Sequence, residues 1–424
     1  MRTPTGLGAA VFFLMGATLA AAAELPRAEP TEVGLSQERL DKITAVLEGD
    51  VSRKAMPGDV LLIARHGKVA YLKALGARDP ETNAAMSEDA IFRIYSMSKV
   101  ITVTAALTLV EDGLVSLDDP IAKYMPQFAN MNVGLATANP AGGDSNVMQL
   151  VPARRPSTVQ DLMRHSSGLT YGFFGDTLVK KAYQGVDLRS GKFTNADLVD
   201  RLAKLPLAYQ PGTTWDYGYS IDVLGRLVEI VSGKSLYQFE KERILDPLEM
   251  SDTSFYVTDA AKKSRIAQPF ADDRSFGVDA TIGDPTEVKP WESGGGGMVS
   301  TARDYARLLQ MFLNGGSLDG KRILGSKTIA YMTSDHLGTE VHPGPYYLPG
   351  PGSGFGLGVA VRTARGGPAS IGEPGEWSWG GAGGTAFWVD PADDMFVVFM
   401  MQSPKQRLHY RTLLRDMTYS AIEK

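Results

Sequence analysis

The stretch Ile94-Tyr95-Ser96-Met97-Ser98-Lys99-Val100 stands where an extended segment gives way to a long apolar helix. It contains the only Ser-x-x-Lys pair in the chain. Three residues along a helix is just under one turn, so the Ser96 hydroxyl and the Lys99 amine are expected on one helix face. A serine amide at a helix start is also free of intrahelical hydrogen bonding, and the helix dipole favours an anion there. The stretch therefore predicts a serine nucleophile, a lysine base and half of an oxyanion hole.

A lysine serves as a base only in its neutral form, which burial favours. The residues after Lys99 supply that burial, because the segment from Val100 to Val110 is apolar nearly all round the helix. Gly113 then ends the helix as a C-terminal cap. The alternative for so short a pattern is a surface serine and lysine that meet by chance.

Length and composition set the outer bounds. With 424 residues the chain suits two structural units or one large mixed unit. Its 43% hydrophobic and 21% charged residues are ordinary for a soluble globular protein. The formal net charge is -5 and no basic patch is evident, so we expect no nucleic-acid partner.

The first 23 residues differ from the rest. Arg2 precedes an apolar run that ends in Ala21-Ala22-Ala23, which is typical of a secretory signal with an Ala-x-Ala cleavage site. An uncleaved membrane anchor is the alternative, although the apolar core from Ala9 to Leu19 is short for a span. We therefore expect a signal peptide over residues 1–23 and an exported protein, periplasmic or secreted.

Several common catalytic groups are missing from the sequence. There is no cysteine, which excludes disulfides, thiol nucleophiles and zinc-thiolate sites. No two of the five histidines have His-Glu-x-x-His spacing, and there is no Gly-x-Ser-x-Gly elbow. We expect no metal and no cofactor. Lys99 therefore stays the candidate for the catalytic base.

Hydrophobic periodicity predicts an interrupted α/β layout. A helix is expected over residues 34–47, and two strands over 59–73 meet at a turn that contains His66. Helical signals dominate the middle, and the last third predicts strands over 354–362, 384–390 and 395–402 before a helix over 407–422. The simplest assembly is one antiparallel sheet flanked by helices. It would use residues 24–92 and 291–424, with an inserted all-helical domain over 93–290 and the active site at the junction.

Two stretches look loop-rich, residues 127–155 and 338–354. Loops of this length are either functional lids or surface excursions, and the pattern does not distinguish them. The run Gly294 to Gly297 has no following Gly-Lys-Ser/Thr, so a tight crossing into a strand near the site is favoured over phosphate binding.

Six motifs together carry a family resemblance. They are Ser96-Met-Ser-Lys99, His165-Ser-Ser-Gly-Leu169, Tyr217 before Asp222-Val-Leu-Gly225, Asp246-Pro-Leu-Glu-Met-Ser-Asp-Thr253, Gly296-Gly-Met-Val-Ser-Thr301 and Trp379-Gly-Gly381. With them the chain resembles the serine β-lactamase and penicillin-binding-protein superfamily over nearly its whole mature length. The likeness is greatest to the family VIII carboxylesterases, which are similar to class C β-lactamases. It implies a β-lactamase/transpeptidase-like α/β fold.

The resemblance also implies roles for single residues. Tyr217 takes the place of the catalytic tyrosine, whose phenol shuttles protons to the leaving alcohol and from water. A packed aromatic whose hydroxyl caps the next helix is the alternative for Tyr217. The amides of Ser96 and Ala382 would form the oxyanion hole.

The same comparison predicts substrate-binding residues: Tyr95, Tyr219, Trp379, Gly380 and Gly381. Gly380 and Gly381 lack a Cβ and would let an acyl group approach the backbone. Trp379 stands where β-lactamases carry a lysine, and Tyr219 stands where many relatives carry an asparagine. Both departures favour an apolar ester over a β-lactam or peptide.

Further aromatics that could line the pocket are Tyr171, Phe173, Phe174, Trp215 and Trp291. His165 follows a predicted helix, and for it we expect a structural hydrogen-bonding role.

The sequence thus predicts an exported serine carboxylesterase that acts on a small-molecule ester or β-lactam-like substrate. β-Lactamase or D-amino-acid peptidase activity is the nearest alternative, and a transesterase fits the same chemistry. A non-catalytic cell-wall ligand sensor belongs to a different class, and retention of Ser96, Lys99 and Tyr217 argues against it.

Overall fold

A computed structural model describes residues 24–140, 146–276 and 282–423. The predicted signal peptide, residues 1–23, lies outside the described residues. Within the described ranges, no helix has both the length and the apolar character that a membrane crossing requires.

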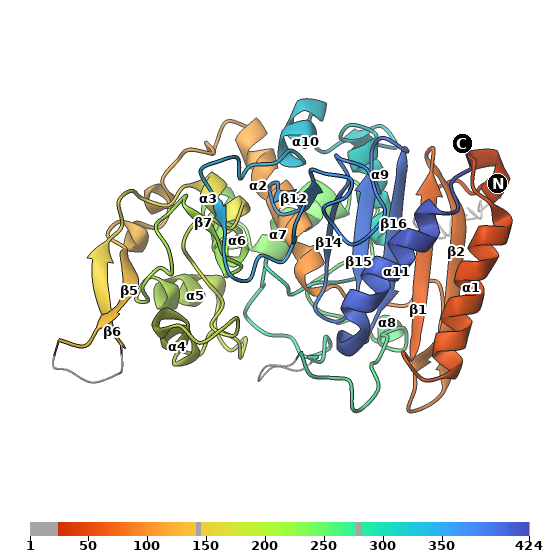
Figure 1. Cartoon of the computed structure of the whole chain (residues 1–424), viewed down its shortest axis with the longest axis horizontal. Helices are drawn as coiled ribbons and strands as arrows, with labels where there is room; N and C mark the ends of the chain where they lie inside the picture. Colours follow the sequence, from red (N-terminus) through yellow and green to blue (C-terminus); the bar gives the residue numbers. More distant parts are fainter. Residues whose placement is uncertain (1–23, 141–145, 277–281, 424) are drawn as a thin grey trace, which may run out of the picture.

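One antiparallel sheet of eight strands organises the molecule (Figure 1). In spatial order its strands are β12 (Ser353–Phe355), β13 (Ala360–Arg362), β14 (Trp377–Gly380), β15 (Ala386–Asp390), β16 (Met395–Met401), β1 (Gly58–Arg65), β2 (Lys68–Asp79) and β3 (Ala84–Ala85). The two ends of the chain meet at its centre, where β1 pairs with β16 from Asp59 opposite Met401 to Arg65 opposite Met395. The predicted antiparallel sheet built from both chain ends is confirmed.

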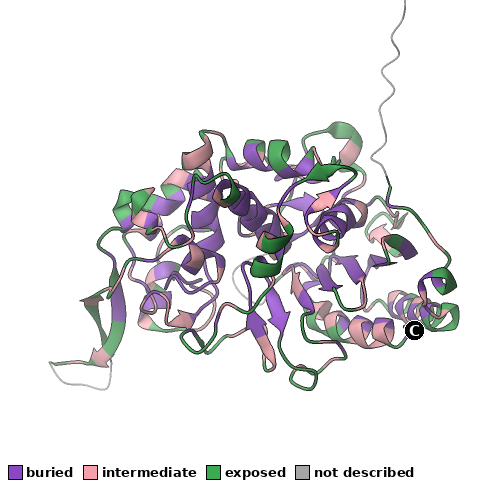
Figure 2. Ribbon diagram, turned by 90° about the horizontal axis from the view of Figure 1, so that it is seen from above, coloured by how far each residue is buried: buried purple, intermediate pink, exposed green. Residues whose placement is uncertain are grey.

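The sheet buries side chains on both faces, because successive residues of a strand point to opposite sides. On β1, Leu61 and Ile63 join the apolar cluster that includes α1 (Gln37–Ser52) and α11 (Arg407–Tyr419). Val60 and Leu62 join the main core, to which α9 (Ala302–Leu313) contributes. Helices therefore cover both faces of the sheet, and the buried strands run through the middle of the molecule (Figures 1 and 2).

Helix α2 (Ser98–Glu111) is the central element beside the sheet. Its residues from Ser98 to Leu109 are all buried, as the apolar pattern of the sequence predicts. Gly113 follows the helix with φ of 72°, a backbone conformation that glycine adopts without steric cost and that ends the helix.

The inserted segment holds most of the remaining helices: α3 (Val159–Met163), α4 (Leu178–Gln184), α5 (Asn195–Leu202), α6 (Ser220–Ser232), α7 (Leu236–Glu240) and α8 (Ala260–Lys263). The short helix α10 (Ser326–Met332) follows α9. Residues 127–155, expected as loop, instead contain the hairpin of β5 (Asn132–Ala138) and β6 (Asn146–Pro152), which projects at the left of Figure 1. The inserted segment is therefore mostly helical and not all-helical.

Two short strand pairs tie distant segments together: β4 (Phe92–Arg93) with β8 (Val299–Ser300), and β7 (Thr214–Trp215) with β11 (His342–Pro343). The strands β9 (Ser317–Leu318) and β10 (Lys321–Arg322) form a local hairpin. The β4–β8 pair places the glycine run 294–297 beside the segment that leads into Ser96. The division of the chain into domains at residues 92 and 291 stays a prediction.

Candidate active site

Ser96 lies in a single 3₁₀ turn, Tyr95–Met97, that runs directly into α2. Tyr95 has φ of 44°, in the left-handed region that costs a residue with a side chain roughly 1 kcal/mol. The Ser98 hydroxyl holds this backbone, because it donates to the Tyr95 carbonyl at 2.6 Å and accepts from the Met298 amide at 3.1 Å. The turn therefore fixes the position of the Ser96 side chain.

Lys99 is fully buried in the first turn of α2, and its amine points at Ser96. The Nζ–Oγ distance between the two residues is 3.2 Å. The amine also donates to the Gly295 carbonyl, and it lies 4.6 Å from the centre of the Tyr217 ring. No carboxylate of the described residues lies within ion-pair distance of this amine. Lys99 is thus placed to exchange a proton with the Ser96 hydroxyl.

Asp222, on α6, organises the turn that meets Lys99 from the other side. Its Oδ1 accepts hydrogen bonds from the Ser293 hydroxyl at 2.6 Å and from the Gly295 amide at 3.2 Å. Burial raises the pKa of Asp222, and the nearby charge of Lys99 opposes that rise. A Cβ at Gly295 would lie 2.3 Å from Asp222 Oδ2, so only glycine fits there. Asp222 therefore presents the Gly295 carbonyl to the lysine, a role that its place in a sequence motif did not reveal.

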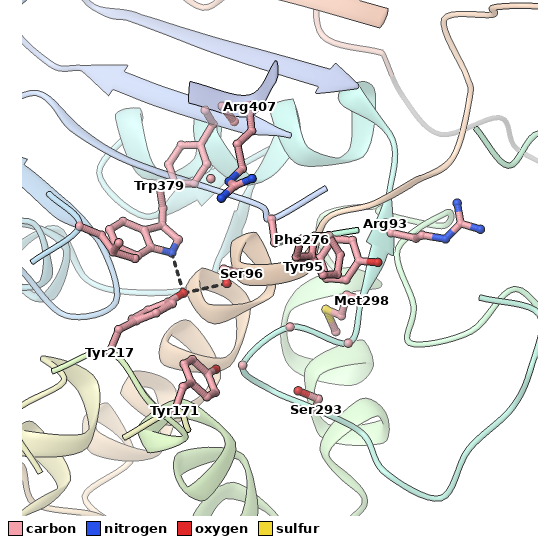
Figure 3. A pocket seen from close by; sticks show the side chains of 18 of the residues that line it. Arg93, Tyr95, Ser96, Tyr171, Tyr217, Phe276, Ser293, Met298, Trp379 and Arg407 are labelled. Carbon is pink, nitrogen blue, oxygen red and sulfur yellow. Dashed lines mark hydrogen bonds between the residues drawn. The ribbon is translucent and has the colours of Figure 1, made fainter. Parts of the chain in front are cut away.

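Tyr217 lies between β7 and α6 and completes a three-residue contact with Ser96 and Lys99. Its hydroxyl donates to Ser96 Oγ at 2.7 Å, and the Trp379 indole nitrogen donates to the Tyr217 oxygen at 3.3 Å (Figure 3). The hydroxyl points at Ser96 and does not cap α6. The structure thus brings the predicted proton shuttle next to the predicted nucleophile and base, although Ser96 lies 121 residues away from it in the sequence.

The turn after β14 carries Ala382 on the pocket wall. Gly381 and Thr385 close the turn through a 2.8 Å hydrogen bond from the Gly381 amide to the Thr385 carbonyl. Arg411 Nη2 donates to the Gly381 carbonyl at 2.8 Å. These contacts hold the backbone around Ala382 at the edge of the pocket.

The two glycines before Ala382 also leave room for neighbouring groups of the protein, while their predicted contact with an acyl group stays a prediction. A Cβ at Gly381 would lie 2.3 Å from Thr385 Oγ1 and 2.5 Å from the Ile94 carbonyl. A Cβ at Gly380 would lie 2.3 Å from Arg411 Nη2. Both positions therefore make room for the protein's own groups, and only Gly380 lines the pocket.

A cavity of about 700 Å³ opens over Ser96. Of the predicted substrate-binding residues, Tyr95, Tyr219 and Trp379 line it, and so do the further aromatics Tyr171, Phe173, Phe174 and Trp291. Phe276 also lines the cavity, edge-on to Tyr95 at 5.1 Å between ring centres, and no sequence pattern had indicated it. Segment 338–354 contributes Leu348 and Pro349 to the wall.

Two aromatic residues have more specific positions. The Tyr219 hydroxyl donates to the Leu188 carbonyl at 3.2 Å, so this residue offers the cavity its ring and not its hydroxyl. Trp215 is fully buried outside the cavity wall and stacks against Tyr217 with 5.8 Å between ring centres. Trp215 therefore supports the tyrosine from behind.

His165 lies next to these aromatic rings and departs from the expected hydrogen-bonding role. Its ring is 4.8 Å from the Tyr217 ring and is 1% exposed, and neither ring nitrogen has a hydrogen-bond partner among the described residues. Burial, and to a smaller extent the charge of Lys99, lowers the pKa of His165 well below its ordinary value. The side chain packs as a neutral aromatic ring.

This burial predicts a pH dependence of stability. In the unfolded chain a histidine binds a proton below about pH 6.5, whereas His165 in the folded protein stays neutral. The unfolded state then binds more protons, so the free energy of unfolding falls as the pH falls below 6.5, by about 1.4 kcal/mol per pH unit for this group. His165→Phe keeps the aromatic packing and is expected to remove that contribution.

Urea unfolding of the wild type and of His165→Phe at pH 7 and pH 5 measures the difference. His409→Phe is the matched control, because His409 is exposed on α11. An equal loss of stability in the wild type and in His165→Phe between the two pH values would contradict a neutral buried His165.

Comparisons with known proteins extend over most of the chain. The profile of the family described as Beta-lactamase matches residues 43–416. Esterase EstB of Burkholderia gladioli is 29% identical and the alignment covers 92% of this chain and 98% of EstB. Lovastatin esterase of Penicillium rubens is 31% identical, with 80% of this chain and 86% of that protein covered. The solved structure of EstCE1, a hydrolase with promiscuous acyltransferase activity, superposes with a TM-score of 0.74 at 27% identity and covers 90% of this chain and 99% of its own.

Proposed function

This chain belongs to the beta-lactamase family of serine hydrolases, and from that premise we propose that it is a carboxylesterase that works through an acyl-enzyme on Ser96. One observation carries the proposal. Ser96 Oγ lies within hydrogen-bond distance of both Lys99 Nζ and Tyr217 OH beneath a cavity lined by aromatic residues. An activated serine between a base and a proton shuttle is the arrangement that covalent acyl transfer requires.

The proposed reaction has two halves. Lys99 takes the proton of Ser96 as Oγ attacks the ester carbonyl, and the amides of Ser96 and Ala382 stabilise the negative oxygen that forms. Tyr217 protonates the departing alcohol as the carbon–oxygen bond breaks. Lys99 then returns its proton to Tyr217, so both groups are as they began. Water attacks the acyl carbon while Tyr217 and Lys99 accept its proton in relay. The bond from that carbon to Ser96 Oγ breaks, the proton returns to Oγ, and the acid and free Ser96 are released.

The walls of the site support an ester as substrate in preference to a β-lactam. By the family resemblance Trp379 stands where β-lactamases carry a lysine, and its indole nitrogen donates to the Tyr217 oxygen. The Tyr219 hydroxyl donates to the Leu188 carbonyl. The side chain at this position therefore offers a substrate neither an amide nor a free hydroxyl. The relatives EstB and lovastatin esterase are both named as esterases.

A parallel substrate panel tests this choice. We expect short p-nitrophenyl esters to give the highest kcat/KM, with a chromogenic cephalosporin and a D-alanyl peptide lower. Ser96→Ala measured on every substrate separates turnover at this serine from background. A cephalosporin turned over faster than every ester would overturn the esterase assignment in favour of a β-lactamase.

Acyl transfer to an alcohol is a second activity that the same site supports. An acyl-enzyme can be attacked by an alcohol in place of water, and EstCE1 is described as a hydrolase with promiscuous acyltransferase activity. We expect added alcohols to divert part of the acyl group into a new ester, detected by mass spectrometry. Hydrolysis products alone, at every alcohol concentration, would exclude the transferase activity.

A further inference from the structure

The cavity over Ser96 has the opposite charge balance from the whole protein. The chain carries 43 basic and 48 acidic residues. The cavity wall carries seven Lys or Arg residues and four Asp or Glu residues. A cavity of one charge sign within a low-dielectric wall concentrates ligands of the other sign.

Most of the wall's acidic groups are already occupied. Glu376 is paired with Arg415 at 3.0 Å and lies 3.9 Å from Arg362. Glu287 lies 3.5 Å from Lys289. Asp222 is bound within the glycine turn beside Lys99. Because these carboxylates already have partners, they do not neutralise the other cations of the cavity wall.

Arg407 and Arg411 are two such cations, and they lie one turn apart on α11. Neither forms an ion pair with a carboxylate of the described residues. Burial and the neighbouring charges of Arg407 and Arg415 lower the pKa of Arg411 to about 10. Arg411 uses Nη2 on the Gly381 carbonyl, and its buried Nε has no hydrogen-bond partner among the described residues. A guanidinium held in this way favours an anion nearby.

Arg407 lines the cavity that opens over Ser96. Its Nη1 donates to the Pro404 carbonyl at 2.6 Å. Figure 3 shows its guanidinium between Trp379 and Phe276, on the side of the cavity that faces Ser96. Arg411 lies in the space that Gly380 leaves by having no Cβ. The two cations thus form a positive wall next to the turn that carries Ala382.

The opposite wall is apolar. Tyr171 and Phe174 line the cavity on the side of Tyr217, with ring centres 5.3 Å and 6.1 Å from its ring. A ligand that fills the cavity meets aromatic rings on one side and a guanidinium on the other. The cavity therefore matches an amphiphilic molecule with an apolar body and one anionic group.

We propose, building on the esterase function above, that the enzyme selects esters that carry a carboxylate, and that Arg407 binds this carboxylate while Arg411 adds positive charge behind it. A guanidinium and a carboxylate form charge-assisted hydrogen bonds in a planar geometry that lysine cannot reproduce. The preference arises from substrate binding and not from the acyl-transfer step. It determines which esters bind next to Ser96.

A matched pair of substrates measures the preference. Mono-p-nitrophenyl adipate and p-nitrophenyl hexanoate share chain length and leaving group, and only the first ends in a carboxylate. We expect the wild type to favour the adipate ester in kcat/KM by about 10- to 100-fold, the range that hydrogen bonds to charged groups supply. Arg407→Gln should reduce this ratio by about the same factor, and Arg407→Lys should retain part of it.

Arg39→Gln is the control for a change of net charge, because Arg39 is exposed on α1 and away from the cavity. It should leave the ratio and the activity unchanged. A wild-type ratio near one, or a ratio that Arg407→Gln leaves unchanged, would overturn the carboxylate preference while hydrolysis of both esters still supports the esterase. Failure to hydrolyse either ester would instead count against the esterase function.

A binding measurement on a variant that cannot turn over substrate tests the carboxylate site separately from the esterase function. Calorimetric titration of 5-phenylpentanoate into the Ser96→Ala protein requires no catalysis. We expect binding that is at least about tenfold tighter than that of neutral 5-phenylpentanol and that weakens when Arg407→Gln is added. Equal binding of the acid and the alcohol would overturn the carboxylate site, whatever the enzyme hydrolyses.

Discussion

Replacing Ser96 with alanine is expected to lower kcat for p-nitrophenyl esters by about 10⁴- to 10⁶-fold, since loss of the nucleophile leaves only binding and oxyanion stabilisation. The fold should persist, because the hydrogen bonds of the Ser96 hydroxyl within the described residues are to Lys99 and Tyr217, both of the proposed catalytic group. Initial rates and circular dichroism of the purified variant measure both effects.

Ser98 offers a matched control two positions along the same motif. Its hydroxyl is buried and hydrogen-bonds with the Tyr95 carbonyl and the Met298 amide, so it supports the turn that carries Ser96. Ser98→Ala is therefore expected to lower turnover far less than Ser96→Ala does, with some loss of stability. A Ser96→Ala protein as active as Ser98→Ala would exclude Ser96 as the nucleophile.

Replacing Lys99 with methionine is expected to lower kcat by about 10²- to 10⁴-fold, the range for loss of a general base. Methionine keeps much of the buried volume and removes the amine that lies 3.2 Å from Ser96 Oγ. The KM should change less than kcat, because the amine acts on the serine and not on bound substrate. Steady-state kinetics on one p-nitrophenyl ester gives both parameters.

Lys327→Met controls for the loss of one lysine, because Lys327 is exposed on α10 and outside the cavity. It should behave as the wild type. Tyr217→Phe is an informative companion, since it removes the second hydrogen bond to Ser96 and leaves the lysine in place. If Lys99→Met kept wild-type kcat, another group would have to be the base.

Local sequence patterns were sufficient to predict Ser96 and Lys99 at the centre of the site. The apolar run after Lys99 predicted a buried helix, and α2 is buried along nearly its whole length. The Ser-x-x-Lys spacing predicted the contact between Ser96 and Lys99, because helix geometry alone sets it. Tyr217 required the family resemblance, since nothing local to it indicates a partner more than a hundred residues away.

The hairpin β5–β6 shows where periodicity fails. Both of its strands are largely exposed on their two faces, so no alternation of apolar and polar residues marks them. Gly134 and the run Asn139-Pro-Ala-Gly-Gly-Asp144 also gave the stretch a loop-like composition. A strand that buries so few of its residues leaves little trace in a single sequence.

The packing around Gly380 and Gly381 could not be predicted from the sequence. The sequence shows that a side chain is absent but not which neighbour needs the space. The neighbours are Arg411 for Gly380, and Thr385 and the Ile94 carbonyl for Gly381. The repeat of arginine at 407, 411 and 415 was the available signal that one face of the last helix is basic.

The central claim is that Ser96 forms a covalent bond to the acyl group, and labelling with a fluorophosphonate tests it most directly. Peptide mass spectrometry of the labelled wild type should find one phosphonyl adduct, on Ser96, with label and loss of esterase activity rising in parallel. An adduct on another residue, or a protein that is fully labelled at Ser96 and still hydrolyses esters, would contradict the account.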